Sequence, residues 1–163
     1  MAVPSRRLVD DASIGAAAGL TDFPTSLRSR EFLMEVLKIS HRVVMTRDLA
    51  REWDNHQTRF SARWRAEMRS RRKIVDLEAT ENAEVRNQVR TSAAVLKDLH
   101  LIEAALATDR IVVSLDERAR RELAVDASKD IVWVNAVLEG GHAVYWLRNG
   151  APDKEEWRLG RQG

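Results

Sequence analysis

The sequence predicts a three-layer α/β/α sandwich with a mostly parallel central sheet. Short β-rich runs alternate with helical stretches along the chain, which is typical of this class. One run, residues 111–115 (IVVSL), is apolar on both faces, as buried parallel strands are. The 163 residues are enough for one domain with a proper core. We expect that domain to span residues 1–148, with a polar tail over residues 149–163.

Strand and helix alternate in the first half of the chain. Residues 6–13 (RRLVDDAS) predict a strand that ends in acids, residues 25–40 predict an amphipathic helix, and residues 41–46 (HRVVMT) predict the next strand. Thr46 can then cap one long helix. Its apolar stripe recurs at helical spacing and comprises Leu49, Trp53, Phe60, Trp64 and Met68. Residues 73–78 (KIVDLE) predict a brief extended piece.

In the second half, residues 82–107 have a helical pattern that we expect to break near residues 90–92. The apolar strand at 111–115 follows, then a short helix at 117–127 and a last strand at 130–137. The tail is polar and contains Gly and Pro, so we expect a loose end or a partner-binding arm.

Composition limits the class of protein. The N-terminal residues combine no basic start with a long apolar region, so no export signal is predicted. No apolar run approaches the roughly 20 residues that a membrane helix needs, which predicts a soluble protein without membrane contact. Cysteine is absent, which excludes disulfides and thiolate metal sites and fits a cytoplasmic location.

Basic residues are concentrated in one stretch, although the net charge is only +2. Residues 59–73 (RFSARWRAEMRSRRK) contain seven basic residues and the single acid Glu67. A polyanion could bind there, or the stretch could be the solvated face of a surface helix. The candidates for contact with a nucleic acid are Arg59, Arg63, Arg65, Arg69, Arg72 and Lys73.

Acids follow two of the predicted strands. Asp10 and Asp11 end the first, and Asp116 ends the strand at 111–115. In open parallel sheets the ligand site lies at the carboxyl ends of the strands, so these acids are candidates for a site. The alternative is that each one caps the helix that follows it.

Asp98 opens the predicted helix that precedes the strand at 111–115. At 100° per residue it shares a face with Ile102 and Ala105, whereas His100 lies near the opposite side. A lone buried carboxylate costs several kcal/mol to keep ionised unless a cation or donor lies opposite it. An ordinary ion pair with Arg or Lys would satisfy Asp98 equally well.

These features together resemble the PIN-domain nucleases, the metal-dependent family that includes VapC-type toxins. The first strand ends in Asp11-Ala12-Ser13, a mid-chain helix carries Glu52, Asp98 opens a helix, and Asp116 ends a buried strand 18 residues later. The resemblance covers most of the chain up to about Val137.

The resemblance implies an acidic cluster in which Asp11, Glu52, Asp98 and Asp116 are catalytic. It also implies that Asp11, Asp98 and Asp116 bind Mg²⁺ or Mn²⁺, with Ser13 and Ser114 as polar supports. Hard divalent ions prefer carboxylate oxygens, and such ions activate water and stabilise charge on a scissile phosphate. The implied activity is an endoribonuclease that hydrolyses RNA phosphodiester bonds. The family also suggests a homodimer, and a small antitoxin partner if the protein is a toxin.

Several alternatives remain at this stage. Asp10 stands where the family usually has an apolar residue, so it could replace or assist Asp11. Asp48 and Asp54 lie close to Glu52 in the sequence. A phosphoacceptor receiver domain also opens with paired aspartates, but the lysine-ended strand that it needs is replaced here by IVVSLD. A non-catalytic PIN-like module that binds RNA or protein is the other functional class.

Overall fold

The computed structural model describes residues 4–78, 80–89, 93–139 and 141–161. Within these residues five strands form one sheet in the order β3-β2-β1-β4-β5. All four strand pairings are parallel, which confirms the predicted sheet. The strands are β1 (Arg7–Asp10), β2 (Arg42–Met45), β3 (Ile74–Asp76), β4 (Ile111–Val113) and β5 (Val132–Val134).

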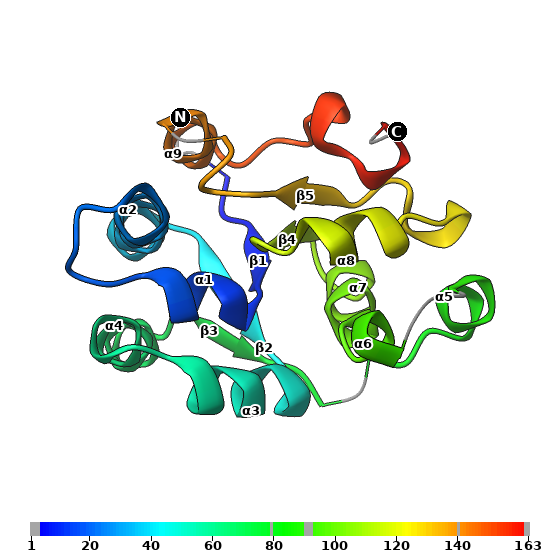
Figure 1. The fold of residues 1–163 in the computed structure, drawn as a ribbon, viewed down its shortest axis with the longest axis horizontal. Coiled ribbons are helices and arrows are strands. Elements are labelled where there is room, and N and C mark those ends of the chain that lie inside the picture. The colour runs from blue at the N-terminus through cyan, green and yellow to red at the C-terminus, as the bar shows by residue number, and fades with distance from the viewer. Residues whose placement is uncertain (1–3, 79, 90–92, 140, 162–163) are drawn as a thin grey trace.

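Helices cover both faces of the sheet and complete the three layers (Figure 1). On one side lie α1 (Ala12–Ala17), α2 (Pro24–Lys38), α4 (Arg59–Ser70) and α9 (Gly141–Arg148). On the other side, α7 (Leu99–Leu106) packs against β1 and β4, with α8 (Glu117–Glu122) beside it. Helix α3 (Arg47–His56) bridges the layers, since it contacts both α1 and α7.

The predicted long helix after β2 is two helices, α3 and α4. Thr46 caps α3 as expected, since its hydroxyl accepts a hydrogen bond from the Leu49 amide at 3.2 Å. Thr58 caps α4, and it forms a reciprocal capping box with Ser61. Helix α3 ends because the backbone becomes extended at Gln57, with φ −66° and ψ 147°, and it stays extended at Thr58. The apolar stripe survives the break, and the rings of Trp53 and Trp64 stack with centroids 5.5 Å apart.

The helical region before β4 is also divided. It contains α5 (Ala83–Gln88), α6 (Ala93–Leu96) and α7. The break expected near residues 90–92 falls outside the described residues. A second interruption precedes α7, where Asp98 is the N-cap residue with φ −92° and ψ 0°. Residues 141–148 form α9, a helix that the sequence pattern did not predict.

The C-terminal segment is packed against the domain, so the expectation of a loose end is wrong for its described residues. Trp157 is 7% exposed and Leu159 is 1% exposed. Arg158 forms an antiparallel bridge with Val132 of β5. Sparse apolar residues in a polar segment were therefore enough to anchor it.

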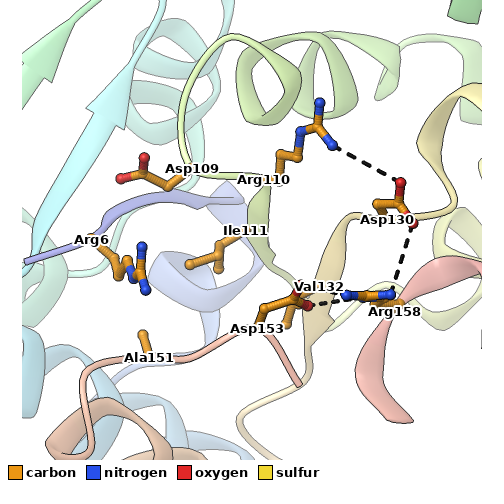
Figure 2. Close-up of a pocket in the computed structure, with 9 residues that line it drawn as sticks. All are labelled: Arg6, Asp109, Arg110, Ile111, Asp130, Val132, Ala151, Asp153 and Arg158. Atoms are coloured by element: carbon orange, nitrogen blue, oxygen red, sulfur yellow. Dashed lines mark hydrogen bonds and ion pairs between the residues drawn. The ribbon is translucent and has the colours of Figure 1, made fainter. Parts of the chain in front are cut away.

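A cleft of about 350 Å³ lies under this segment, at the amino ends of β4 and β5 (Figure 2). Arg158 pairs with Asp153 at 2.5 Å and lies 3.9 Å from Asp130, which in turn lies 4.0 Å from Arg110. These ion pairs link the segment to the loops that precede the two strands. The cleft is therefore a junction that helps to hold the C-terminal segment in place.

Among the described residues, no helix has the length and apolar character needed to cross a membrane.

Candidate metal site

The candidate site lies at the carboxyl ends of β1 and β4. The chain runs outward from β1 to β2 and β3, then returns to place β4 on the other side of β1. This reversal is the switch point where open parallel sheets bind ligands. The Asp11 amide donates to the Val113 carbonyl at 2.8 Å, so the residues that follow the two strands are neighbours.

Two serine hydroxyls orient Asp11. Ser13 Oγ and Ser114 Oγ each donate to Asp11 Oδ2 at 2.7 Å. Asp11 is 7% exposed, and burial raises the pKa of its carboxyl against the lowering effect of these two hydrogen bonds. The charges of Glu52 and Asp116 also raise it. Ser13 and Ser114 thus occupy the supporting positions that the sequence analysis expected.

Asp10 is not part of the same hollow. Its side chain is fully buried, and neither carboxylate oxygen has a hydrogen-bond partner among the described residues. Burial, and secondarily the charge of Asp11, holds the pKa of Asp10 well above its usual value. Successive side chains of a strand point to opposite faces, so the structure places Asp11, rather than Asp10, with the other acids.

Asp116 is both a helix cap and a member of the site. Its Oδ1 accepts a hydrogen bond from the Ala119 amide at 2.9 Å, which satisfies the first turn of α8. The same residue lines a hollow of about 290 Å³ with Asp11, Glu52 and Asp98. The capping interpretation of this acid is therefore confirmed, and its position in the hollow keeps it a candidate for the site.

Glu52 is placed by the packing of α3. The neighbouring Trp53 is fully buried, and its indole Nε1 donates to the Asp10 carbonyl at 2.9 Å. This contact fixes α3 against the end of β1 and presents Glu52 to the hollow. The competing acid Asp54 instead pairs with Arg65 at 2.6 Å. Asp48 lies in an adjacent hollow.

Asp98 is a buried acid in a negative environment. It is 7% exposed, and burial is the main cause that raises the pKa of its carboxyl to about 6. The charges of Asp11, Glu52 and Asp116 add to this rise, whereas Lys97 opposes it. Within the described part of the chain, the Asp98 carboxylate accepts no hydrogen bond and forms no ion pair. The ordinary ion pair that was considered for Asp98 is therefore not formed there.

His100 is a member of the cluster that the sequence analysis missed. Its Nε2 lies 3.0 Å from Glu52 Oε1, and the ring is 11% exposed. Burial lowers the pKa of His100, but the hydrogen bond and charge of Glu52, with the charges of Asp48 and Asp98, raise it overall. One ligand atom from each of Glu52, Asp98 and His100 lies within 4.8 Å of the other two. These three residues could therefore hold a metal ion.

The acids outside the cluster have other partners. Glu103 is 2% exposed on its side chain and pairs with Arg86 at 2.9 Å. Glu117 lies in the first turn of α8 and pairs with Arg120 at 2.5 Å.

The basic stretch runs away from the site. Lys73 precedes β3, so it lies at the edge of the sheet opposite to Asp11. Its ammonium donates to the carbonyls of Val36 at 2.5 Å and Leu37 at 2.9 Å at the end of α2. Burial, with a smaller contribution from Arg71, lowers the pKa of Lys73 to about 8. The structure thus gives Lys73 a capping role in the fold.

The arginines of this stretch differ in their contacts. Arg65 pairs with Asp54, and Arg69 binds Asp76 through two hydrogen bonds of 2.8 and 3.1 Å. The exposed side chains without an ion pair to a described residue are Arg59, Arg63 and Arg72.

Other basic residues lie closer to the acids. Lys97 lines the hollow of the acidic cluster and also the adjacent hollow of about 310 Å³, which Arg51 lines as well. Neither belongs to a basic run, so charge density along the sequence could not find them. The proximity of α3 and α7 brings them together.

Comparisons with known proteins add no assignment: no family model, curated protein or solved structure matches the chain.

Proposed function

We propose that this protein is an endoribonuclease with a PIN-like fold, which hydrolyses RNA phosphodiester bonds with the help of Mg²⁺ or Mn²⁺. The observation that supports the proposal is the convergence of Asp11, Glu52, Asp98 and Asp116 on one hollow at the switch point of the sheet. These are the four acids that the resemblance to PIN nucleases implies. Glu52 lies in α3, and the other three immediately precede α1, α7 and α8.

The donor set fits a hard divalent ion. Carboxylate oxygens are the ligands that Mg²⁺ and Mn²⁺ prefer, and several carboxylates that repel one another are stabilised by a cation. Burial is the main cause that raises the pKa values of Asp11 and Asp98, and this repulsion adds to it. A bound ion would supply an activated water and charge stabilisation at the scissile phosphate.

The protein's own groups would prepare this chemistry. The two serines fix the direction of Asp11, and the buried Trp53 fixes the helix that carries Glu52. Lys97 and Arg51, beside the acids, are suited to contact the phosphates that flank the cleaved bond. Arg59 and Arg63 could extend this contact along α4. A homodimer, and an antitoxin if the protein is a toxin, belong to the same proposal.

An RNA cleavage assay with purified protein tests the proposal. Cleavage should require Mg²⁺ or Mn²⁺ and should stop in Asp98→Asn and Asp116→Asn. Asparagine caps helices as well as aspartate does, so the second variant removes the charge but keeps the start of α8. The control is Asp130→Asn, which changes an acid at the opposite edge of the sheet and should leave cleavage unchanged.

Metal-independent cleavage, or full activity in both site variants, would refute the nuclease. RNA binding without cleavage under all metal conditions would instead support a non-catalytic RNA-binding module.

A further inference from the structure

We propose that His100 is a metal ligand alongside Glu52 and Asp98, so that the site is a mixed imidazole–carboxylate centre that prefers Mn²⁺ to Mg²⁺. The inference deepens, and rests on, the metal site of the proposed function. It adds a ligand type that the four-acid pattern of the sequence does not contain, and with it a preference among ions.

The distances fit one shared ion. Two ligands at right angles on an ion, each about 2.1 Å away, are about 3.0 Å apart, and opposite ligands are about 4.2 Å apart. His100 Nε2 and Glu52 Oε1 are separated by 3.0 Å. All three ligand atoms lie within 4.8 Å of one another. An ion can therefore replace the proton between Nε2 and Oε1 and reach Asp98 with small adjustments of the side chains.

Asp98 is an independent sign of a ligand at this position. Asp98 is 7% exposed as a whole residue and lines the hollow, and among the described residues its carboxylate forms no hydrogen bond or ion pair. The hollow also holds Asp11, Glu52 and Asp116, whose charges repel the Asp98 carboxylate, and a cation would relieve that repulsion. A cation between the Asp98 carboxylate and the His100 ring would explain why these two side chains approach each other.

His100 itself is poorly satisfied by the fold. Its Nδ1 is buried without a partner among the described residues, and Nε2 contacts only Glu52. An ion at Nε2 would give Nδ1 no partner, so the contact that points to a ligand is that of Nε2 with Glu52. Leu99 and Leu101, which flank His100 in the sequence of α7, are both buried, so a purely structural role would favour an apolar residue at this position.

The ligand type decides the preference among ions. Mg²⁺ binds oxygen almost exclusively and gives up its water reluctantly. Imidazole suits first-row transition metals, and carboxylate suits Mn²⁺ as well as Mg²⁺. A site with two carboxylates and one imidazole therefore favours Mn²⁺.

Pulsed electron paramagnetic resonance on the Mn²⁺-loaded protein tests the assignment directly, because a bound imidazole nitrogen modulates the Mn²⁺ signal. The parent protein should show this nitrogen coupling, and His100→Gln should lose it. Glutamine can still donate to Glu52, so this variant keeps the orientation of Glu52 and removes only the imidazole. His56→Gln is the matched control, since His56 lines the hollow of the four acids but is outside the cluster of Glu52, Asp98 and His100, whereas His100 lines the adjacent hollow.

Calorimetry on the same samples measures the preference. The parent should bind Mn²⁺ more tightly than Mg²⁺, and His100→Gln and His100→Leu should weaken Mn²⁺ binding by about tenfold or more, with a smaller effect on Mg²⁺. Absent nitrogen coupling in the parent, coupling that persists in His100→Gln, or an unchanged preference would overturn the inference.

These outcomes are separate from those of the proposed function. Coupling that depends on His100, without RNA cleavage, would uphold the centre and refute the nuclease. Cleavage supported equally by both ions, with no nitrogen coupling, would uphold the nuclease and refute the His100 ligand.

Discussion

Replacing Asp98 by asparagine should stabilise the metal-free protein at neutral pH. The environment of Asp98 raises the pKa of its carboxyl from 3.8 to about 6, mainly through burial and then through the nearby carboxylates. Keeping the group ionised above pH 6 therefore costs about 3 kcal/mol as an upper bound. The hollow is open to water, and screening reduces this cost to about 1–2 kcal/mol. Asparagine has nearly the same shape and avoids that cost.

The sign of the pH dependence follows from the direction of this pKa. The folded protein holds the Asp98 proton more tightly than the unfolded chain does, so the stability of the parent falls as the pH rises from about 4 to about 6. The gain in Asp98→Asn should therefore be full above pH 6 and should vanish near pH 4. Thermal unfolding in EDTA should show a midpoint about 3–6 °C higher for the variant at pH 7.5.

The control for this experiment is Asp109→Asn, where the effect should be opposite. Burial raises the pKa of Asp109. The hydrogen bonds and charge of Arg7 outweigh this effect and lower the pKa below its usual value. Its ion pair stabilises the fold above the unfolded pKa and is lost in acid, so the variant should be less stable at pH 7.5. A destabilised Asp98→Asn at pH 7.5 would refute the reasoning, because it would mean that Asp98 has a stabilising partner.

Three further outcomes are expected. Gly15→Ala should lower the free energy of unfolding, measured with denaturant, by about 1–3 kcal/mol, because the added methyl group would lie 2.5 Å from the Trp53 ring. An unchanged free energy of unfolding would mean that this contact is easily relieved. Trp157→Ala should cost about 3 kcal/mol and expose the C-terminal segment to protease, whereas unchanged proteolysis would contradict its anchoring role. Arg59→Gln with Arg63→Gln should flatten the salt dependence of RNA affinity by about 0.7 per lost phosphate contact, and an unchanged slope would assign these residues to the solvated face.

The fold class was predictable because the signals for a parallel sheet are local. Buried strands such as β4 are apolar on both faces, and segments with helical periodicity separate them in the sequence. The break between α3 and α4 was harder to foresee, since the apolar stripe continues through it. The capping box of Thr58 and Ser61 is the signal that distinguishes two helices from one, and it lies within an otherwise uniform pattern.

The order of the C-terminal segment could not be predicted from its own residues. Its composition is polar, and its order depends on Trp157 and Leu159, which contact parts of the chain far away in sequence. The Leu159 amide donates to the Ile131 carbonyl at 2.9 Å, and the Trp157 and Trp146 rings lie 5.7 Å apart. Tertiary contacts of this kind leave no periodic pattern in the segment itself.

The candidate site was predictable for its acids but not for its histidine, and the reason is a single backbone position. Placing Asp98 and His100 on one regular helix puts them on nearly opposite sides. In the structure Asp98 is the N-cap residue, with ψ near 0°, so the 100° rule does not apply between it and α7. His100 lies within the first turn of α7 and reaches Glu52 of α3. The departure from helical geometry at Asp98 is therefore what allows one carboxylate and one imidazole, two residues apart, to approach the same point.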